Sequence, residues 1–427
     1  MRLASFLLAT TPALLLPLAG CAAQPRPQLV PSTHAALTRA MEIVRTDNEW
    51  TLEQQASICE IEAPPFKEER RAAEYARRLE ALGLVNVRID SEGNVIAERP
   101  GSGDGPVVVI SAHLDTVFPE GTDVTVTREG GMMRAPGIGD DCRGLAVVLA
   151  VARAMNQADV RTTGTVLFVG TVGEEGPGNL RGVRHLFAES LRDQVDYFIS
   201  VDGTGLGLTS GAVGSHRYRV TYKGPGGHSY GAFGMPNPIH ALGRAIAKVS
   251  DLQTPRDPRT TFAVGVVAGG TSVNSIAYEA SMDVDMRSES KASLDELDAK
   301  FQTAIREALA EERARWPQST RELEMAIDTI GIRPAGSQPD SARIVQVAMA
   351  ARDAVVAGHE VVVPSGTNAS STDANLPISL GIPAITIDGG GVGRGSHSLD
   401  EGYNDGPVGW LGPQWAVLVV AGLAGVR

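Results

Sequence analysis

The sequence predicts an α/β fold in which helices cover both faces of a mostly parallel sheet, with a smaller α+β domain inserted into the chain. Three features support this prediction. Short apolar runs rich in Val and Ile occur at 106–112, 165–171 and 196–201, and such runs are typical of strands buried on both faces of a parallel sheet. A helical segment at 143–155 separates two of them. Residues 216–330 instead combine alternating strand patterns with two helices, which is the pattern of a separate α+β domain.

The elements of the main domain follow one another in a consistent order. Residues 67–83 have apolar side chains at helical spacing and stop at a glycine. Two strands follow, VNVRID and NVIAERP, joined by a Gly-Asn turn, and then the three buried runs. A fourth run, PAITID at 383–388, lies far downstream. The apolar run at 415–426 is too short to span a bilayer, so it is expected to form a buried C-terminal helix. The main domain is therefore predicted in two parts, 39–215 and 331–427.

The inserted domain is predicted from the pattern between these two parts. HRYRVTYKG alternates polar and apolar residues like a half-exposed strand, and TTFAVGVVAGG, YEASMDVDMRS and RELEMAID are also strand-like. Two helical stretches lie among them, at 236–252 and 292–316. A small sheet with two helices accounts for the α+β domain at 216–330.

Composition excludes some classes of partner. The 427 residues are 43% hydrophobic, as in a globular protein, and carry a formal net charge of −12. An acidic chain does not offer the basic surface that phosphate binding needs, so nucleic acid is not expected as a partner. Cys59 and Cys142 could pair in an exported protein, but one pair is no disulfide framework, and the sequence leaves their state open.

The N-terminus predicts export. Residues 1–20 contain one basic residue and an apolar stretch interrupted by two prolines, which is typical of a signal peptide. The LAGC sequence that ends at Cys21 resembles a bacterial lipoprotein box, which implies cleavage before Cys21 and a diacylglycerol on its sulfur. The alternative is ordinary secretion with an incidental cysteine. Residues 21–38 are Pro- and Gln-rich and are expected to form a tether. The protein is therefore expected to be lipid-anchored to a bacterial membrane, facing the periplasm or the exterior.

Polar side chains able to bind a metal follow three of the buried runs. His113 and Asp115 follow the first run. Glu174 and Glu175 follow the second, and Asp202 follows the third. The carboxyl ends of the strands form the ligand crevice of an open α/β sheet, so all three runs deliver these groups to one rim.

Two loops supply further candidates, each with a simpler structural explanation. APGIGDDCRG contains Asp140 and Asp141 just before a helix, and either carboxylate could cap that helix. His397 in GRGSHSLDE could be an ordinary surface histidine, and Ser398 and Glu401 could form a capping box.

Considered together, these residues suit a pair of metal ions. Two histidines and three carboxylates form a borderline N/O ligand set suited to divalent ions, zinc first. One carboxylate shared between two ions would offset their repulsion, and a further carboxylate could act as general base on the bridging water. Consecutive residues at a strand end point in different directions. One of Glu174 and Glu175 can therefore bind metal while the other faces the water.

The motifs also resemble a known family. The stretches SAHLDTVFP, APGIGDD, GTVGEEGPGN, VDG, GGHS and GSHSLDE occur in the order seen in a family of co-catalytic dizinc metallopeptidases. That family includes carboxypeptidase G, tripeptide aminopeptidase (peptidase T), dipeptidases, and acetylornithine and succinyl-diaminopimelate deacylases. The resemblance covers about residues 40–427 and implies a catalytic domain of the zinc exopeptidase type with an inserted dimerisation domain. Each motif is weak alone, but six in one order are specific.

The resemblance implies a role for each member of the ligand set. His113 and Asp202 would bind one ion. Glu175 and His397 would bind the other, and Asp140 would bridge the two.

The same resemblance implies roles around the ligands. Asp115 would orient His113, and Glu174 would be the general base. The chain departs from the pattern at Cys142, where many members have Lys. Cys142 could be a soft ligand or, alternatively, a small buried residue.

In the inserted domain, the resemblance implies dimerisation through a sheet edge. His228 of GGHS would reach the partner's active site and polarise the scissile carbonyl. Asn274 and Arg287 match positions that bind a substrate carboxylate. The alternatives are a loop histidine, a turn asparagine and a strand-surface arginine. A polar loop could also line the pocket, through Gly366, Thr367 and Asp373.

These observations predict a lipid-anchored, homodimeric dizinc amidohydrolase that cleaves short peptides or N-acyl amino acids. Metal-activated water would attack the carbonyl, with Glu174 as base and Arg287 selecting a free carboxylate. Two alternatives remain: a dedicated amino-acid N-deacylase, and a catalytically inactive binding lipoprotein on the same fold. Export favours peptide scavenging, because biosynthetic deacylases act in the cytoplasm.

Overall fold

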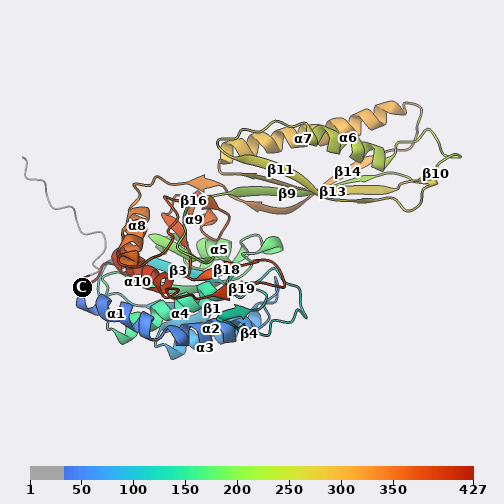
Figure 1. The fold of residues 1–427 in the computed structure, drawn as a ribbon. Coiled ribbons are helices and arrows are strands. Elements are labelled where there is room, and N and C mark those ends of the chain that lie inside the picture. Colours follow the sequence, from blue (N-terminus) through green and yellow to red (C-terminus); the bar gives the residue numbers. More distant parts are fainter. Residues whose placement is uncertain (1–32) are drawn as a thin grey trace, which may run out of the picture.

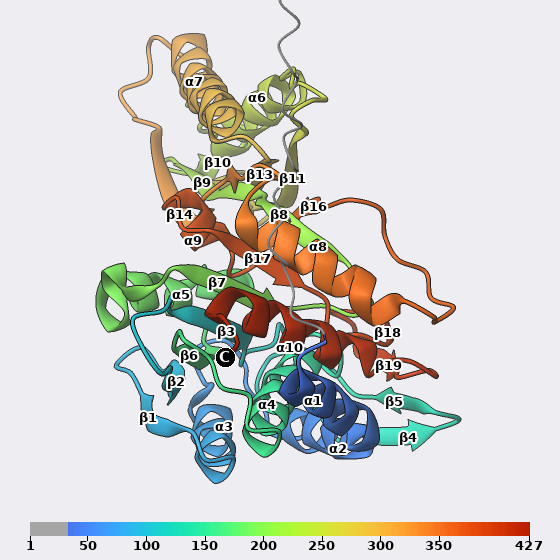
Figure 2. The ribbon, with the colours of Figure 1, turned by 90° about the vertical axis from the view of Figure 1, so that its left-hand side faces the viewer.

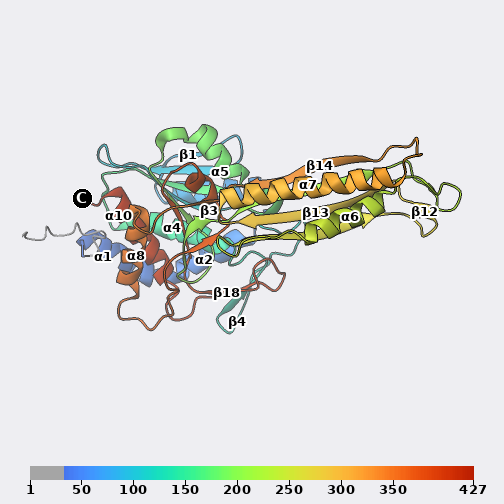
Figure 3. The same ribbon diagram turned by 90° about the horizontal axis from the view of Figure 1, so that it is seen from above.

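The computed structural model describes residues 33–427 in two parts (Figure 1). One part is a layered α/β unit. The other is an arm of strands and two helices that extends away from it, as the view from above also shows (Figure 3). The predicted signal peptide at 1–20 and the predicted lipidation at Cys21 lie outside the described residues. Helix α1 begins at Ala35, inside the range 21–38 that was expected to be a tether.

The α/β unit is built on a nine-stranded mixed sheet in the order β1-β2-β6-β3-β7-β17-β8-β15, with β16 beside β8. The four central strands, β6, β3, β7 and β17, run parallel to one another. The flanking pairs are antiparallel, apart from β16 with β8. The α/β prediction is confirmed, with the parallel strands at the centre of the sheet. The strands are β1 (Val85–Ile89), β2 (Val95–Arg99), β3 (Val108–His113), β6 (Val166–Thr171), β7 (Tyr197–Val201), β8 (Leu208–Ala212), β15 (Gly336–Ser337), β16 (Asn368–Ser370) and β17 (Ala384–Ile387).

Helices cover both faces of this sheet. One face packs its apolar side chains against α1, α2, α3, α4, α8 and α10, and the other packs against α5, η2 and α9. Figure 2 shows α1 to α4 gathered on one side of the strands. The helices are α1 (Ala35–Thr46), α2 (Asn48–Cys59), α3 (Glu69–Ala81), α4 (Cys142–Gln157), η1 (Gly176–Gly178), α5 (Arg181–His185), η2 (Leu186–Ser190), η3 (Arg192–Gln194), α8 (Arg343–Val356), α9 (Asn375–Ser379) and α10 (Leu411–Ala424).

A small antiparallel sheet joins two distant loops beside the main sheet. Its order is β18-β19-β5-β4. Pairing of β5 with β19 places the loop that follows β5 next to the loop between β18 and β19. Two of the sequence motifs, APGIGDD and GSHSLDE, are therefore brought together. The strands are β4 (Thr127–Glu129), β5 (Met132–Arg134), β18 (Val392–Arg394) and β19 (Gly402–Asn404).

The arm contains a four-stranded antiparallel sheet in the order β11-β13-β9-β14. Helices α6 and α7 pack on one face of it, around a core of its own. A two-stranded pair, β10 with β12, forms the far tip (Figures 1 and 3). The elements are β9 (Gly214–Lys223), β10 (Gly227–His228), α6 (Pro238–Ser250), β11 (Thr260–Gly269), β12 (Ser275–Ile276), β13 (Glu279–Ser288), α7 (Lys291–Arg315) and β14 (Glu324–Arg333).

Helix α10 is the buried C-terminal helix that the apolar run predicted, since every residue from Leu411 to Ala424 is buried. Among residues 33–427, none of the helices combines the length and apolar character needed to cross a membrane.

The structure pairs the two internal cysteines. Cys59 ends α2 and Cys142 begins α4, and a disulfide joins them across a Cα–Cα distance of 5.5 Å. Both side chains are fully buried. The pairing answers the question that the sequence left open. It also makes the soft-ligand interpretation of Cys142 wrong, because a disulfide sulfur is not a thiolate.

Candidate metal and catalytic site

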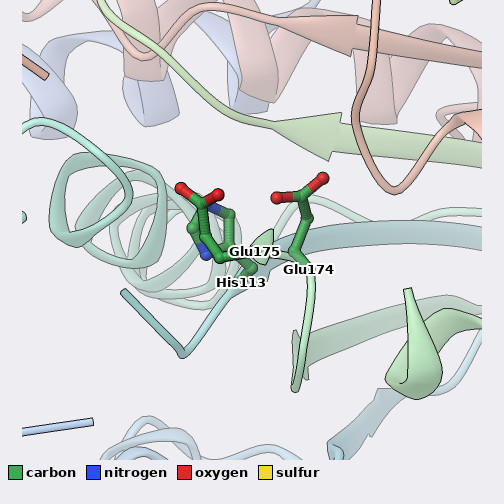
Figure 4. Close-up of side chains that lie close together, drawn as sticks. All are labelled: His113, Glu174 and Glu175. Atoms are coloured by element: carbon green, nitrogen blue, oxygen red, sulfur yellow. The ribbon is translucent and has the colours of Figure 1, made fainter. Parts of the chain in front are cut away.

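The parallel strands deliver their polar residues to one rim, as expected. β3 ends at His113, Glu174 and Glu175 follow β6, and β7 is followed by Asp202. Because Gly173 has a positive φ of 65°, the chain turns sharply between the strand and the two glutamates. Figure 4 shows the result: the carboxylate of Glu175 lies beside His113, and that of Glu174 lies to one side of this pair.

Asp140 lies between the two histidines. Its Oδ1 is 3.1 Å from Nε2 of His113, and its Oδ2 is 3.2 Å from Nε2 of His397. Oε1 of Glu175 is 2.8 Å from the same His397 nitrogen. Potential ligand atoms of His113, Asp140 and Asp202 lie within 4.8 Å of one another, and so do those of Asp140, Glu175 and His397. Two groups of three residues therefore share Asp140.

This set brings three largely buried carboxylates together, beside a buried His113 and a half-exposed His397. Burial raises the pKa of Asp202 to about 7, and the neighbouring Asp140 adds to the rise. Hydrogen bonds with Asp140 and Glu175 raise the pKa of His397 to about 10. Three carboxylates beside two imidazoles therefore fit a pair of divalent cations, which would neutralise the clustered charge. Nitrogen and oxygen donors in this number are also what zinc accepts.

Asp115 supports both glutamates and His113. Its carboxylate accepts the N–H groups of Glu174 at 3.0 Å and Glu175 at 2.8 Å. Nδ1 of His113 lies 3.0 Å from the backbone oxygen of Asp115 and 3.6 Å from its Oδ1. Asp115 thus contacts His113 through its main chain, while its side chain aligns the glutamate pair.

The two neighbouring aspartates divide the roles that the sequence left open. Asp141 caps α4 by accepting the N–H of Gly144 at 2.9 Å, and its other oxygen accepts the N–H of His113 at 3.0 Å. Asp140 points into the ligand set instead. The capping explanation therefore applies to Asp141 alone.

Glu401 holds the loop that carries Asp140. Its carboxylate accepts the N–H groups of Gly137 at 3.0 Å, Gly139 at 2.8 Å and Asp140 at 2.9 Å. Burial raises the pKa of Glu401 to about 7, although these bonds oppose the rise. The alternative explanation, a capping box formed by Ser398 and Glu401, does not hold, because no helix begins there and Glu401 reaches across to the other loop.

Glu174 forms a buried ion pair with Arg333. Nη1 of Arg333 donates to Oε1 of Glu174 at 2.9 Å and to Oγ of Ser371 at 3.0 Å. The side chains of both ion-pair partners are about 5% exposed. Burial raises the pKa of Glu174 well above its usual range, and the charge of Arg333 opposes that rise. A carboxylate oxygen of Glu174 also lies within 4.8 Å of potential ligand atoms of His113 and Glu175, so this carboxylate faces the same space as the metal groups.

A cavity of about 640 Å³ opens onto the ligand set. Arg287 of the arm lines this cavity, as do Arg217 and Arg333. The prediction that Gly366, Thr367 and Asp373 line the pocket is wrong. Asp373 is fully buried, and the same loop contributes other residues, which are Asn368, Ser370, Ser371 and Thr372.

His228 and Asn274 lie together at the far tip of the arm. His228 pairs with Ser275 across β10 and β12, and the N–H of Ser229 donates to the backbone oxygen of Asn274 at 2.9 Å. Neither lines the cavity of its own chain. Within one chain, Asn274 therefore lies away from the cavity that Arg287 lines, and its role toward a substrate carboxylate stays a prediction.

Sequence reasoning missed three residues of this site, which are Arg217, Arg333 and Glu401. Arg217 occupies one position of an alternating strand, and nothing local distinguishes it from Arg219. Arg333 and Glu401 act on partners 159 and 261 residues away in the sequence. The one available signal was the position of Glu401, only four residues after the candidate ligand His397.

The sequence profile described as peptidase family M20/M25/M40 matches residues 109–412. The chain belongs to this family. It is therefore a metal-dependent hydrolase, and the resemblance inferred from the motifs is confirmed.

Individual relatives agree with this assignment. The succinyl-diaminopimelate desuccinylase of Leptothrix cholodnii is 28% identical over 62% of this chain and 72% of its own length. The aminopeptidase PepT of Bacillus cereus has the same fold, with a TM-score of 0.69 and 20% identity over 88% of this chain and 98% of its own. The YXEP protein of Bacillus subtilis, described as a dinuclear metal binding peptidase, has a TM-score of 0.64 and 18% identity over 89% of this chain and 99% of its own.

Proposed function

We propose that this hydrolase uses two zinc ions to cleave the amide bond of short peptides or N-acyl amino acids. The observation that carries the proposal is the position of Asp140, which offers one carboxylate oxygen to each of two histidines. A carboxylate with this geometry can bridge two cations, and each cation would complete its set from different strands and loops. The residues that would hold the ions are His113, Asp140, Glu175, Asp202 and His397. When bound, the ions would polarise the scissile carbonyl and activate a water molecule.

Glu174 is proposed to move the proton. Its carboxylate faces the ligand groups but pairs with Arg333 rather than with either of the two ligand histidines. Glu174 can accept a proton from the attacking water and return it to the leaving amine. Arg333 would keep the Glu174 carboxylate oriented throughout, because its guanidinium also donates to Ser371.

Arg287 is proposed to bind the free carboxylate of the substrate. It lines the same cavity as the ligand set, on the arm side. A guanidinium recognises a carboxylate through paired N–H donors, which fixes the orientation of the scissile bond as well as its distance.

His228 is proposed to act on the active site of a second copy of the chain. It is exposed at the far tip of the arm, in the two-stranded pair with β12. Strand β11 is an edge strand with exposed residues along most of its length, so a second β11 could pair with it. A homodimer formed in this way would carry His228 and Asn274 toward the partner's cavity.

The matched pair Glu174→Gln and Glu175→Gln tests this division of roles. Glu174→Gln should retain its metal and lose about 10²–10⁴-fold in turnover, the usual contribution of a general base. Glu175→Gln should instead lower the occupancy of one ion. Metal analysis and kinetics on di- and tripeptides and N-acetyl amino acids measure both effects. Exchanged phenotypes would show that the two glutamates have the opposite roles.

We also propose that the protein is exported and lipid-anchored through Cys21. The support is the sequence alone: a signal-peptide pattern at 1–20 that ends in a lipoprotein box.

A further inference from the structure

Two arginines of the arm share one aspartate at the edge of the cavity. Arg217 on β9 lies opposite Asp285 on β13, and Arg287 lies two residues beyond Asp285 on the same face of β13. Nε of Arg217 donates to Oδ1 of Asp285 at 2.8 Å, and Nε of Arg287 donates to Oδ2 at 2.8 Å. One carboxylate therefore balances two guanidinium groups, and both arginines line the cavity.

The neighbouring pair on the same two strands is built differently. Arg219 lies opposite Asp283 and binds it through both Nε and Nη2, each at 2.7 Å. The side chain of Arg219 is 53% exposed and does not line the cavity. Within residues 33–427, by contrast, Arg217 donates only through Nε, so both of its terminal nitrogens remain available. Arg219 therefore has a carboxylate of its own. Arg217 instead lines the cavity with two terminal nitrogens that have no acceptor among the described residues.

The rest of the lining favours a polar occupant. Val117 is the single apolar side chain among the lining residues of the described chain, and the third arginine, Arg333, is already paired with Glu174. Asp388 also lines the cavity, but its carboxylate accepts the N–H of Gly207 at 2.7 Å. An apolar substrate side chain would find little surface to pack against, while an anionic one would meet the free donors of Arg217.

We propose that Arg217 binds a second carboxylate of the substrate, so that the enzyme prefers substrates whose carboxylate-bearing residue is Asp or Glu. This inference rests on the proposed function, in which Arg287 binds the first carboxylate. The two arginines, aligned by Asp285, then recognise a dicarboxylic amino acid as a unit. A neutral residue would leave the terminal nitrogens of Arg217 without a partner and partly shielded from water, because Asp285 contacts only Nε of this guanidinium and is shared with Arg287. Such unpaired donors are unfavourable.

Pairs of substrates that differ only in the second carboxylate test whether the enzyme recognises that group. Ala-Glu and Ala-Gln, and N-acetyl-glutamate and N-acetyl-glutamine, differ in one charged group at nearly constant shape. The wild-type enzyme should favour the acidic member of whichever pair it cleaves by about 10- to 100-fold in kcat/KM, the usual effect of a hydrogen bond to a charged group. Most of the difference should lie in KM, since Arg217 does not contact the reacting atoms.

Arg217→Gln should remove this preference by lowering kcat/KM for the acidic substrate about 10- to 100-fold, with the neutral one nearly unchanged. Arg219→Gln, on the same face of the same strand, should leave kcat/KM unchanged for both the acidic and the neutral substrate. Equal losses for both substrates, or no preference in the wild type, would overturn the proposal.

A binding measurement makes the result independent of turnover. Calorimetric titration of the metal-loaded protein with glutamate and with glutamine should show tighter binding of glutamate, and Arg217→Gln should abolish the difference. If the wild type cleaves neutral and acidic substrates equally, the proposed function stands and the role of Arg217 fails. If no amide is cleaved but glutamate binding depends on Arg217, the proposed function fails and the subsite stands. If glutamate binds no better than glutamine, the subsite fails.

Discussion

Removal of the disulfide between Cys59 and Cys142 should strongly destabilise the protein. The bond closes a loop over a sequence separation of 83 residues. In the chain-entropy treatment, such a cross-link removes about 15 cal/mol/K from the unfolded ensemble, or about 4.5 kcal/mol at 25 °C. That amount is a large share of the 5–15 kcal/mol that typically stabilises a folded domain. The same bond ties α2 to the start of α4, two residues after Asp140.

Urea unfolding with and without reductant measures this contribution. Each single variant, Cys59→Ala or Cys142→Ala, should lose about as much free energy of unfolding as the double variant, because either change removes the same cross-link. Reductant should shift the urea midpoint of the wild type toward that of the variants and leave the midpoint of the double variant unchanged. The reasoning would be refuted if the two single effects added, or if reductant left the wild-type midpoint unchanged.

Three further outcomes are expected. Glu401→Gln should weaken metal binding about 10- to 100-fold, because an amide replaces a carboxylate that accepts three N–H groups. Chelator competition measures the metal affinity, and Glu189→Gln, at an exposed glutamate, is the control. Cys21→Ser should move the protein out of the detergent phase, and equal partitioning of variant and wild type would point to another anchor. Mixed Glu174→Gln and His228→Ala chains, unfolded and reassembled, should regain about a quarter of the active sites; a mixture as inactive as each variant alone would rule out a shared site.

The main sheet and its ligands could be predicted because their signals are local. His113 ends one buried apolar strand and Asp202 directly follows another, and parallel strands end at one rim by geometry. Asp140 and His397 carried weaker signals, since each had a plausible structural explanation and only the joint pattern favoured a metal site. The antiparallel pair of β1 and β2 agrees with the two strands predicted around a Gly-Asn turn. Strand β8 and its antiparallel pairing with β17 were not predicted, because β8 carries no continuous apolar run.

The supporting residues could not be predicted, because their partners are remote in sequence. Arg333 reaches Glu174 only after the arm returns its last strand to the main domain. Glu401 reaches the loop of Asp140 only through the pairing of β5 with β19. The separation of Asn274 from Arg287 depends on the length of the arm, which the order of strands alone does not reveal. Contacts between residues so far apart in the sequence produce no local sequence pattern from which they could be predicted.

Metal analysis of the purified protein, combined with activity before and after chelation, tests the central claim most directly. Two ligand groups that share Asp140 predict about two divalent ions per chain, loss of amide hydrolysis when a chelator removes them, and recovery when zinc is restored. A protein that contains no divalent ion, and whose hydrolysis of peptides and N-acyl amino acids is unaffected by chelation, would contradict the account.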